Sequence, residues 1–323
     1  MKSLVRRILI PVLLVISGTC QVKGQHAAPI GLQYEVDLTQ AINHYVTVTL
    51  TAQPTGPETE LMMATWTPGS YLVREYARHI DRVTAQDLNG ESLLLLKTRK
   101  NRWLVETPDG KPFQVTYRIY CNEASVRTNL AKREYCVLNG APTFLTIPEQ
   151  SGHRHQVNLQ LPDNWRVSAS SMRPIEGHTH SYVAADYDEL VDSPIVAGNV
   201  QLFPFEVAGV EHYLVNVNDR GNWDGEKAAR DLEKVVAAHH EMWGTVPYDR
   251  YFFLNVIDAG GGGLEHDNSC LMMTRSQSFR DDNSYVSWLS LCSHEFFHTW
   301  NIRRLRPKSL VEYDYEAEVY TPS

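Results

Sequence analysis

The chain has 323 residues, which is enough for two domains that each bury a sizeable core. Its hydrophobic content of 43% and charged content of 21% are those of an ordinary soluble globular protein. The net charge of −8, without a basic stripe or an RNA-binding string, argues against a nucleic-acid partner.

Residues 1–24 have the pattern of a signal peptide. A basic n-region that contains Lys2 and Arg6 precedes the apolar run Ile8–Ile16, which is too short to cross a bilayer. A small-residue cleavage site follows, with Gln25 as the first mature residue. We therefore expect an exported protein, periplasmic or secreted, without a stable membrane span.

A lipid anchor is the alternative that Cys20 raises, because lipoproteins are modified on a cysteine that follows the apolar region. The residues before it, Ser17-Gly18-Thr19, fit a lipidation box poorly. Lipoprotein anchoring through Cys20 is therefore the less favoured alternative.

Residues 25–205 are predicted to form an N-terminal β domain. Short alternating runs of polar and apolar residues recur between turn residues, which is typical of a sandwich-like or saddle-shaped sheet. The segment Trp66–Arg78 is expected to be a loop and short helix that pack this domain rather than a site. The predicted strands are Gln33–Thr39, Tyr45–Thr51, Glu60–Thr65, Arg102–Thr107, Phe113–Cys121 and Val157–Leu161.

Four cysteines follow in the mature part, and an exported protein can oxidise them. Cys121 and Cys136 are close enough in sequence to staple a hairpin-like excursion. Spacing alone does not support a bond between Cys270 and Cys292. The disulfide pairing therefore stays open at this point.

Residues 206–323 are predicted to form part of a catalytic domain. Two strands are expected in Phe203–Val217, and Trp223–Trp243 has the broad apolar face of a helix. Gly244 is placed to cap that helix, and the apolar run Tyr251–Ile257 predicts a buried strand.

A glycine run follows this strand. Gly260–Gly263 continues as Leu264-Glu265-His266. Consecutive glycines are poor in the interior of a strand or helix, but they let the backbone approach another strand or a ligand closely. A carboxylate beside such an edge strand can bind the free amino group of a peptide. Taken alone, the run favours a flexible loop with an ordinary surface glutamate, but its position about thirty residues before the run His294–His298 leads us to predict that Gly262, Gly263 and Glu265 bind the substrate.

The run His294-Glu295-Phe296-Phe297-His298 is an HExxH motif on a predicted amphipathic, largely buried helix. Residues four apart share a helix face, so His294 and His298 can reach one metal ion, and zinc accepts neutral imidazole nitrogens. Glu295 lies beside them, where a carboxylate can take a proton from water at the metal. The motif predicts zinc ligands at His294 and His298 and a general base at Glu295.

These two motifs resemble the glycyl aminopeptidase family of zinc metallopeptidases, which is metallopeptidase family sixty-one. The stretches His294–Pro307 and Gly262–His266 are similar to the signatures of its catalytic domain. Three strings earlier in the chain resemble its N-terminal domain: Trp66–Arg78, Ser125–Asn129 and Asp186–Pro194. The resemblance covers nearly everything after residue 30.

The resemblance implies a gluzincin, related in fold to aminopeptidase N, that removes small N-terminal residues such as glycine and alanine. Its fold class would be α+β, with an N-terminal all-β saddle or sandwich domain followed by the first half of a thermolysin-like zinc metallopeptidase domain. It gives His294 and His298 the role of zinc ligands, Glu295 that of general base, and Glu265 that of anchor for the substrate amino group. Peptides with a free N-terminus are the expected partners, and the oligomeric state is left open.

The chain departs from the family pattern at its end. The family carries its third zinc ligand, a glutamate, on the next helix in a Trp-x-x-Glu-Gly-Phe-Thr context, whereas this chain ends at Ser323. We therefore expect a fragment that is inactive by itself and that lacks the third ligand and the family's usual PDZ domain. Ordinary surface carboxylates are expected at the acidic positions after the motif, Glu312, Asp314, Glu316 and Glu318.

The arginines after the motif, at positions 303, 304 and 306, have no assigned role in this scheme. Cations at a helix C-terminus interact favourably with the helix dipole. A basic helix exit that Pro307 terminates is therefore the expected arrangement.

Two other functions remain open. A non-catalytic binding module would retain the fold without a complete zinc site. An endopeptidase of the thermolysin kind would need no amine anchor, so Glu265 would have no role in binding its substrate.

Overall fold

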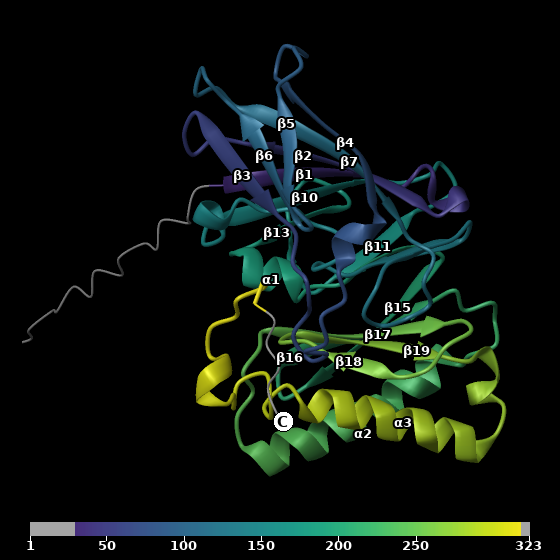
Figure 1. The fold of residues 1–323 in the computed structure, drawn as a ribbon. Helices are drawn as coiled ribbons and strands as arrows, with labels where there is room; N and C mark the ends of the chain where they lie inside the picture. The colour runs from purple at the N-terminus through teal and green to yellow at the C-terminus, as the bar shows by residue number, and fades with distance from the viewer. Residues whose placement is uncertain (1–29, 318–323) are drawn as a thin grey trace, which may run out of the picture.

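The computed structural model describes residues 30–317, so the predicted signal peptide and Cys20 lie outside the described residues. Within this range the chain forms four sheets and three α-helices, arranged in layers (Figure 1). No helix of the described part is long and apolar enough to cross a membrane. Single turns of 3-10 helix lie at Ala41–Asn43, Tyr76–His79, Pro148–Gln150, Ser276–Phe279 and Lys308–Leu310.

The first layer is a seven-stranded sheet with a three-stranded sheet beside it. The order in the larger sheet is β12 (Arg173–Pro174), β13 (Ser181–Ala184), β10 (Arg154–Gln160), β1 (Ile30–Asp37), β2 (Tyr45–Ala52), β7 (Phe113–Tyr120) and β4 (Ile80–Asp87). The order in the smaller sheet is β3 (Glu58–Met62), β6 (Arg102–Glu106) and β5 (Leu95–Arg99). Every second residue of β2 and β7 is buried, because one face of the sheet covers the largest hydrophobic core.

The second layer is a four-stranded sheet that is buried on both faces. Its order is β11 (Val167–Ser170), β14 (Ile195–Gly198), β9 (Tyr135–Leu138) and β8 (Leu130–Ala131). Cys136 and Leu138 of β9 face the core of the first layer, whereas Tyr135 and Val137 face the next sheet. The short helix α1 (Tyr187–Val191) precedes β14 and begins at Asp186, whose side chain accepts a hydrogen bond from the Glu189 amide.

The third layer is a five-stranded mixed sheet, with the helices beyond it. Its order is β15 (Val200–Val207), β16 (Val210–Val217), β17 (Arg250–Ile257), β19 (Ser269–Thr274) and β18 (Gly263–Glu265). The helices α2 (Gly225–Trp243) and α3 (Asp282–Phe297) cover the face opposite the four-stranded sheet (Figure 1). Since both faces are covered, β17 and β19 are apolar along nearly their whole length.

The predicted α+β class, with a β domain in the N-terminal part, is confirmed. The helix predicted for Trp223–Trp243 is α2, and Gly244 caps it in the left-handed conformation. The domain boundary between residues 205 and 206 stays a prediction, and β15 runs across this position.

The possible disulfides are not formed. Cys121, Cys136, Cys270 and Cys292 are free and buried, and burial raises the pKa of each thiol. All four side chains belong to the hydrophobic cores.

Candidate metal centre and amine site

The two histidines of the HExxH motif converge at the end of α3. The helix begins after Asp281, whose side chain accepts a hydrogen bond from the Ser284 amide. His294 lies in the last turn and His298 at the C-cap, so the two imidazoles share one face. Their Nε2 atoms are 3.2 Å apart.

This pair suits a zinc ion. His298 Nδ1 lies 2.9 Å from the carbonyl oxygen of Asn301, which can only accept, so Nδ1 carries the proton and Nε2 is free to coordinate. Two zinc–nitrogen bonds at a tetrahedral angle would hold their nitrogens about 3.3 Å apart. The observed separation and the tautomer of His298 therefore both fit the predicted ligand pair.

Glu295 lies on the buried side of α3, in the same stripe as Trp288 and Cys292. Its residue surface is only 4% exposed. Burial raises the pKa of its carboxyl to about 7, with a further contribution from the charge of Glu265 and an opposing one from Arg127. The predicted general base is thus held away from bulk water, beside a second carboxylate.

Glu265 reaches the same place from the sheet. It ends β18, an edge strand that pairs on one side only, with β19. One carboxylate oxygen of Glu265, one of Glu295 and one ring nitrogen of His298 all lie within 4.8 Å of one another. The structure therefore brings together the predicted amine anchor, the predicted base and, through His298, the predicted metal ligands.

The glycine run allows this approach at two positions. A Cβ on Gly263 would overlap the carboxylate of Glu295, so only glycine lets β18 lie so close to α3. Gly262 has a φ of 103°, which side chains other than that of glycine rarely adopt. Both residues were predicted to bind substrate; Gly263 lies on the edge strand against Glu295, and Gly262 directly precedes that strand.

Two residues of the N-terminal domain for which no role in the site was predicted also reach it. Gly69 packs against Glu265, although its segment was expected only to pack the domain. Arg127 Nη2 lies 3.5 Å from the carbonyl oxygen of Gly263, on β18. Both residues belong to sequence segments that resemble the family's N-terminal domain but lack the alternating pattern of a strand. A family-like segment without a strand pattern was the signal that could have indicated a role in the site.

The segment after α3 differs from the expected basic helix exit. The helix ends at Phe297, well before Pro307, because the chain turns after His298. Arg304 then donates to the carbonyl oxygens of Thr299, Pro247 and Asp267 at 2.8 to 3.0 Å. The arginines thus satisfy turn carbonyls and buried carboxylates, which spacing alone does not indicate.

Among the described residues, none of the acidic side chains at positions 312, 314 and 316 belongs to the group formed by Glu265, Glu295 and His298. Glu316 pairs with Arg102 and accepts a hydrogen bond from Asn101, both on the N-terminal domain. Glu312 and Asp314 are exposed. Glu312 and Asp314 are surface carboxylates as predicted, whereas Glu316 is half-buried in its pair with Arg102, and Glu318 lies outside the described part.

Two family models match the sequence. The model described as the Peptidase M61 N-terminal domain matches residues 33–199, and the model described as M61 glycyl aminopeptidase matches residues 287–323. No curated protein matches the chain.

Solved structures of aminopeptidases resemble the chain. The crystal structure of an aminopeptidase N family protein from Idiomarina loihiensis has a TM-score of 0.85 and 31% sequence identity, over 90% of this chain and 51% of that one. Aminopeptidase A of Legionella pneumophila, in complex with aspartic acid, has a TM-score of 0.52 and 14% identity, over 84% of this chain and 34% of that one. The second similarity concerns the fold alone. The chain spans about half the length of the Idiomarina structure.

Proposed function

The chain belongs to the M61 glycyl aminopeptidase family, and from this premise we propose that it is part of a zinc-dependent aminopeptidase that releases small N-terminal residues from peptides. The observation that carries the proposal is the convergence of four side chains. The Nε2 atoms of His294 and His298 lie 3.2 Å apart, and the ring of His298 lies beside the carboxylates of Glu265 and Glu295. The description of the matched family as glycyl aminopeptidase supports glycine or alanine as the residue released.

In the proposed reaction each residue has one task. His294 and His298 would hold a zinc ion, which when bound supplies Lewis-acid activation of water and of the peptide carbonyl. Glu295 accepts the proton of the attacking water and returns it to the leaving amine. Glu265 binds the protonated N-terminus by a charge-assisted hydrogen bond, which places the first peptide bond beside Glu295.

The amine anchor is what separates an aminopeptidase from an endopeptidase. Glu265 lies beside the proposed base, so a substrate amine bound to it would place the first peptide bond at that base. We also propose export of the protein, on the strength of the basic and apolar pattern of residues 1–24.

The base is tested with the full-length gene product and the substitution Glu295→Gln. Glutamine keeps the shape of the side chain but cannot accept the proton, so kcat on an alanyl peptide should fall by about 100- to 10,000-fold. Glu233→Gln, an exposed site on α2, is the matched control and should keep full activity. Addition of a chelator should abolish activity, and zinc should restore it. Full activity of Glu295→Gln would refute the mechanism.

The anchor is tested with Glu265→Ala and two substrates, one with a free and one with an acetylated N-terminus. An aminopeptidase should lose at least about tenfold in kcat/KM on the free peptide and should not cleave the blocked one. Cleavage of the blocked peptide that is insensitive to Glu265→Ala would instead identify an endopeptidase. Peptide binding without any cleavage by the wild type would favour a non-catalytic binding module.

A further inference from the structure

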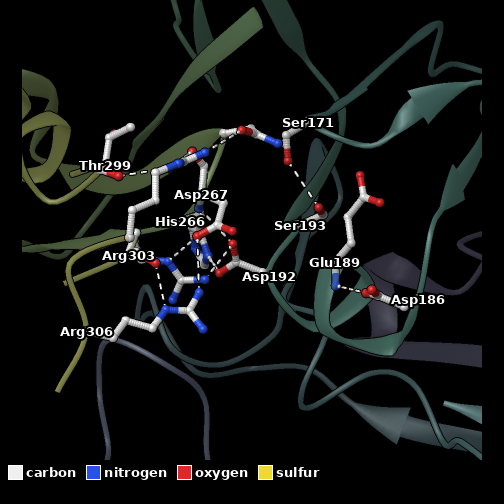
Figure 2. A network of polar contacts seen from close by, with 12 residues as sticks. Ser171, Asp186, Glu189, Asp192, Ser193, His266, Asp267, Thr299, Arg303 and Arg306 are labelled. Carbon is white, nitrogen blue, oxygen red and sulfur yellow. Dashed lines mark hydrogen bonds and ion pairs between the residues drawn. The ribbon is translucent and has the colours of Figure 1, made fainter. Parts of the chain in front are cut away.

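Figure 2 shows a group of polar side chains through which the N-terminal domain contacts the residues that follow Glu265 and the turn after α3. Asp192 contributes from the C-cap of α1. His266 and Asp267 are the two residues that directly follow Glu265. Arg303 comes from the turn after α3. We call these four residues the interdomain cluster.

Asp192 is the hub of the interdomain cluster. Its Oδ1 accepts a hydrogen bond from His266 Nδ1 at 2.9 Å, and its Oδ2 accepts one from the Asp267 amide at 2.7 Å. Oδ2 also pairs with Arg303 Nη2 at 2.9 Å, while Arg303 Nε donates to Asp267 Oδ1 at 2.7 Å. One carboxylate therefore contacts all three partners, as the dashed lines in Figure 2 show.

Asp192, His266 and Arg303 are buried, whereas the side chain of Asp267 is 39% exposed. Arg303 is 2% exposed and His266 is 1% exposed. Burial by itself would raise the pKa of Asp192, but the charges of Arg303 and His266 and the hydrogen bonds outweigh it and lower that pKa. Burial would likewise lower the pKa of Arg303, and Asp192 and Asp267 raise it instead. Both ions stay charged because each is the partner of the other.

A buried ion pair of this kind is a weak source of stability but a strong constraint on geometry. Apolar residues of the same volume often stabilise a fold as well, because they avoid the desolvation of two charges. Removal of one partner, by contrast, leaves an uncompensated charge. The cluster is therefore better explained by the orientation that it imposes than by the stability that it adds.

The interdomain cluster orients the side chain of Glu265 in particular. The ring of His266, the residue after β18, contacts Asp192, whereas the carboxylate of Glu265 lies beside Glu295 and His298. Asp192 accepts hydrogen bonds from the ring of His266 and from the backbone amide of Asp267, immediately after the predicted anchor Glu265. These hydrogen bonds hold the chain at the end of β18. The carboxylate of Glu265, at that strand end, lies beside Glu295 and His298.

Asp192 also contacts the turn after α3, on the other side of the site, through Arg303. The Arg303 amide donates to the carbonyl oxygen of His298 at 3.1 Å, within the turn that follows the metal ligand. Ile302, just before Arg303, has a φ of 91°, which is a strained value for a β-branched residue. The strained turn directs the guanidinium of Arg303 back to Asp192.

We propose that Asp192, from the N-terminal domain, is a positioning residue that holds His266 and Asp267 so that Glu265 faces the substrate amine. The inference rests on the proposed function of Glu265. It makes the N-terminal domain a part of substrate binding rather than a separate support.

The test is Asp192→Asn in the full-length enzyme with zinc bound. A displaced anchor weakens binding in the ground state and the transition state alike, so KM for a free-amine substrate should rise about tenfold while kcat stays within about threefold. The inhibition constant of alaninamide, which binds through its amine, should rise by the same factor. Asp81→Asn, at the more exposed pair with Arg118, is the matched control and should change neither value.

A purely structural role gives a different result. Loss of correctly folded enzyme would lower kcat and leave KM unchanged, and that outcome would overturn the proposal. If Asp192→Asn does not fold, His266→Ala replaces it, with His266→Asn as the conservative variant. Asparagine retains a donor for Asp192 and should keep KM within about threefold, whereas alanine should raise KM about tenfold. Equal KM values for the two variants would contradict the inference.

A second readout does not depend on catalysis. The His266 amide donates to the carbonyl oxygen of Ser269 at 2.9 Å, so its hydrogen exchange reports how firmly the strand end is held. Asp192→Asn should accelerate exchange in residues 264–269 at least fivefold, and Asp81→Asn should not. Unchanged exchange would overturn the proposal even if the wild type proved to cleave nothing. Failure of the wild type to release N-terminal residues would refute only the proposed function.

Discussion

Gly69 lies against the carboxylate of Glu265, and a Cβ placed on it would lie 2.8 Å from Oε1 and 2.8 Å from Leu264 Cδ1. Its φ of 83° is also one that a glycine adopts without strain. The residue therefore meets two demands at once, a turn of the chain and close contact with the predicted amine anchor. At this scale the N-terminal domain limits the space around Glu265.

Gly69→Ala should raise KM for a free-amine substrate about tenfold, because the added methyl group displaces the Glu265 carboxylate. The matched control is Gly90→Ala. Gly90 has a similar φ of 90°, but nothing lies within 4 Å of its added Cβ. Both variants should lose about 1–2 kcal/mol of stability from the backbone conformation. An equal change of KM in the two would show that contact with Glu265 does not matter.

At the scale of elements, the site is made where β18 meets α3. The strand supplies Glu265 and the helix supplies Glu295 and His298, and Gly263 lets the two approach. The outer edge of β18 carries no strand partner among the described residues. An extended peptide can bind to such an edge through its backbone, with its N-terminus at Glu265.

Gly263→Ala should lower kcat at least about 100-fold, because the new Cβ would overlap the Glu295 carboxylate and force it aside. Gly261→Ala serves as control in the same run of glycines, where an added Cβ meets nothing within 4 Å. We expect the control to retain activity within about threefold. Steady-state kinetics and thermal melting of both variants measure the effect, and similar losses in the two would contradict the proposed contact.

The elements were well predicted where burial alone shapes the sequence. The strand at Tyr251–Ile257 and the helix at Trp223–Trp243 are found within about two residues of the predicted ends, because their apolar patterns match their surroundings. The end of α3 was not predicted. The charged residues Arg303 and Arg304 fit a helix end by propensity, but they bind buried partners that belong to other parts of the chain.

At the scale of the whole molecule, neutral histidines are buried in both halves. His155 lies on β10 of the seven-stranded sheet and His212 on β16 of the five-stranded sheet, and neither is exposed to solvent. Desolvation lowers the pKa of each to about 4. A histidine protonates near pH 6.5 in the unfolded chain, so acidification favours unfolding of both halves.

The stability from these two residues should be fully present above pH 6.5 and be lost as the pH falls towards 4. Each should contribute on the order of 2–3 kcal/mol to the difference between pH 7.5 and pH 4.5. His155→Gln should reduce that difference by about this amount, as measured by urea unfolding at the two pH values. The exposed substitution His178→Gln is the control and should leave it unchanged. A pH dependence in His155→Gln equal to that of the wild type would contradict the assignment.

The fold class of this protein and the chemistry proposed for it could both be predicted from the amino-acid sequence alone. HExxH spacing places two imidazoles on one helix face, and alternating apolar runs predict strands, because both patterns depend on residues close in the chain. The residues that surround Glu265 could be identified only from the tertiary structure. Gly69, Arg127 and Asp192 come from distant parts of the N-terminal domain, and packing against β18, not local spacing, brings them to the site.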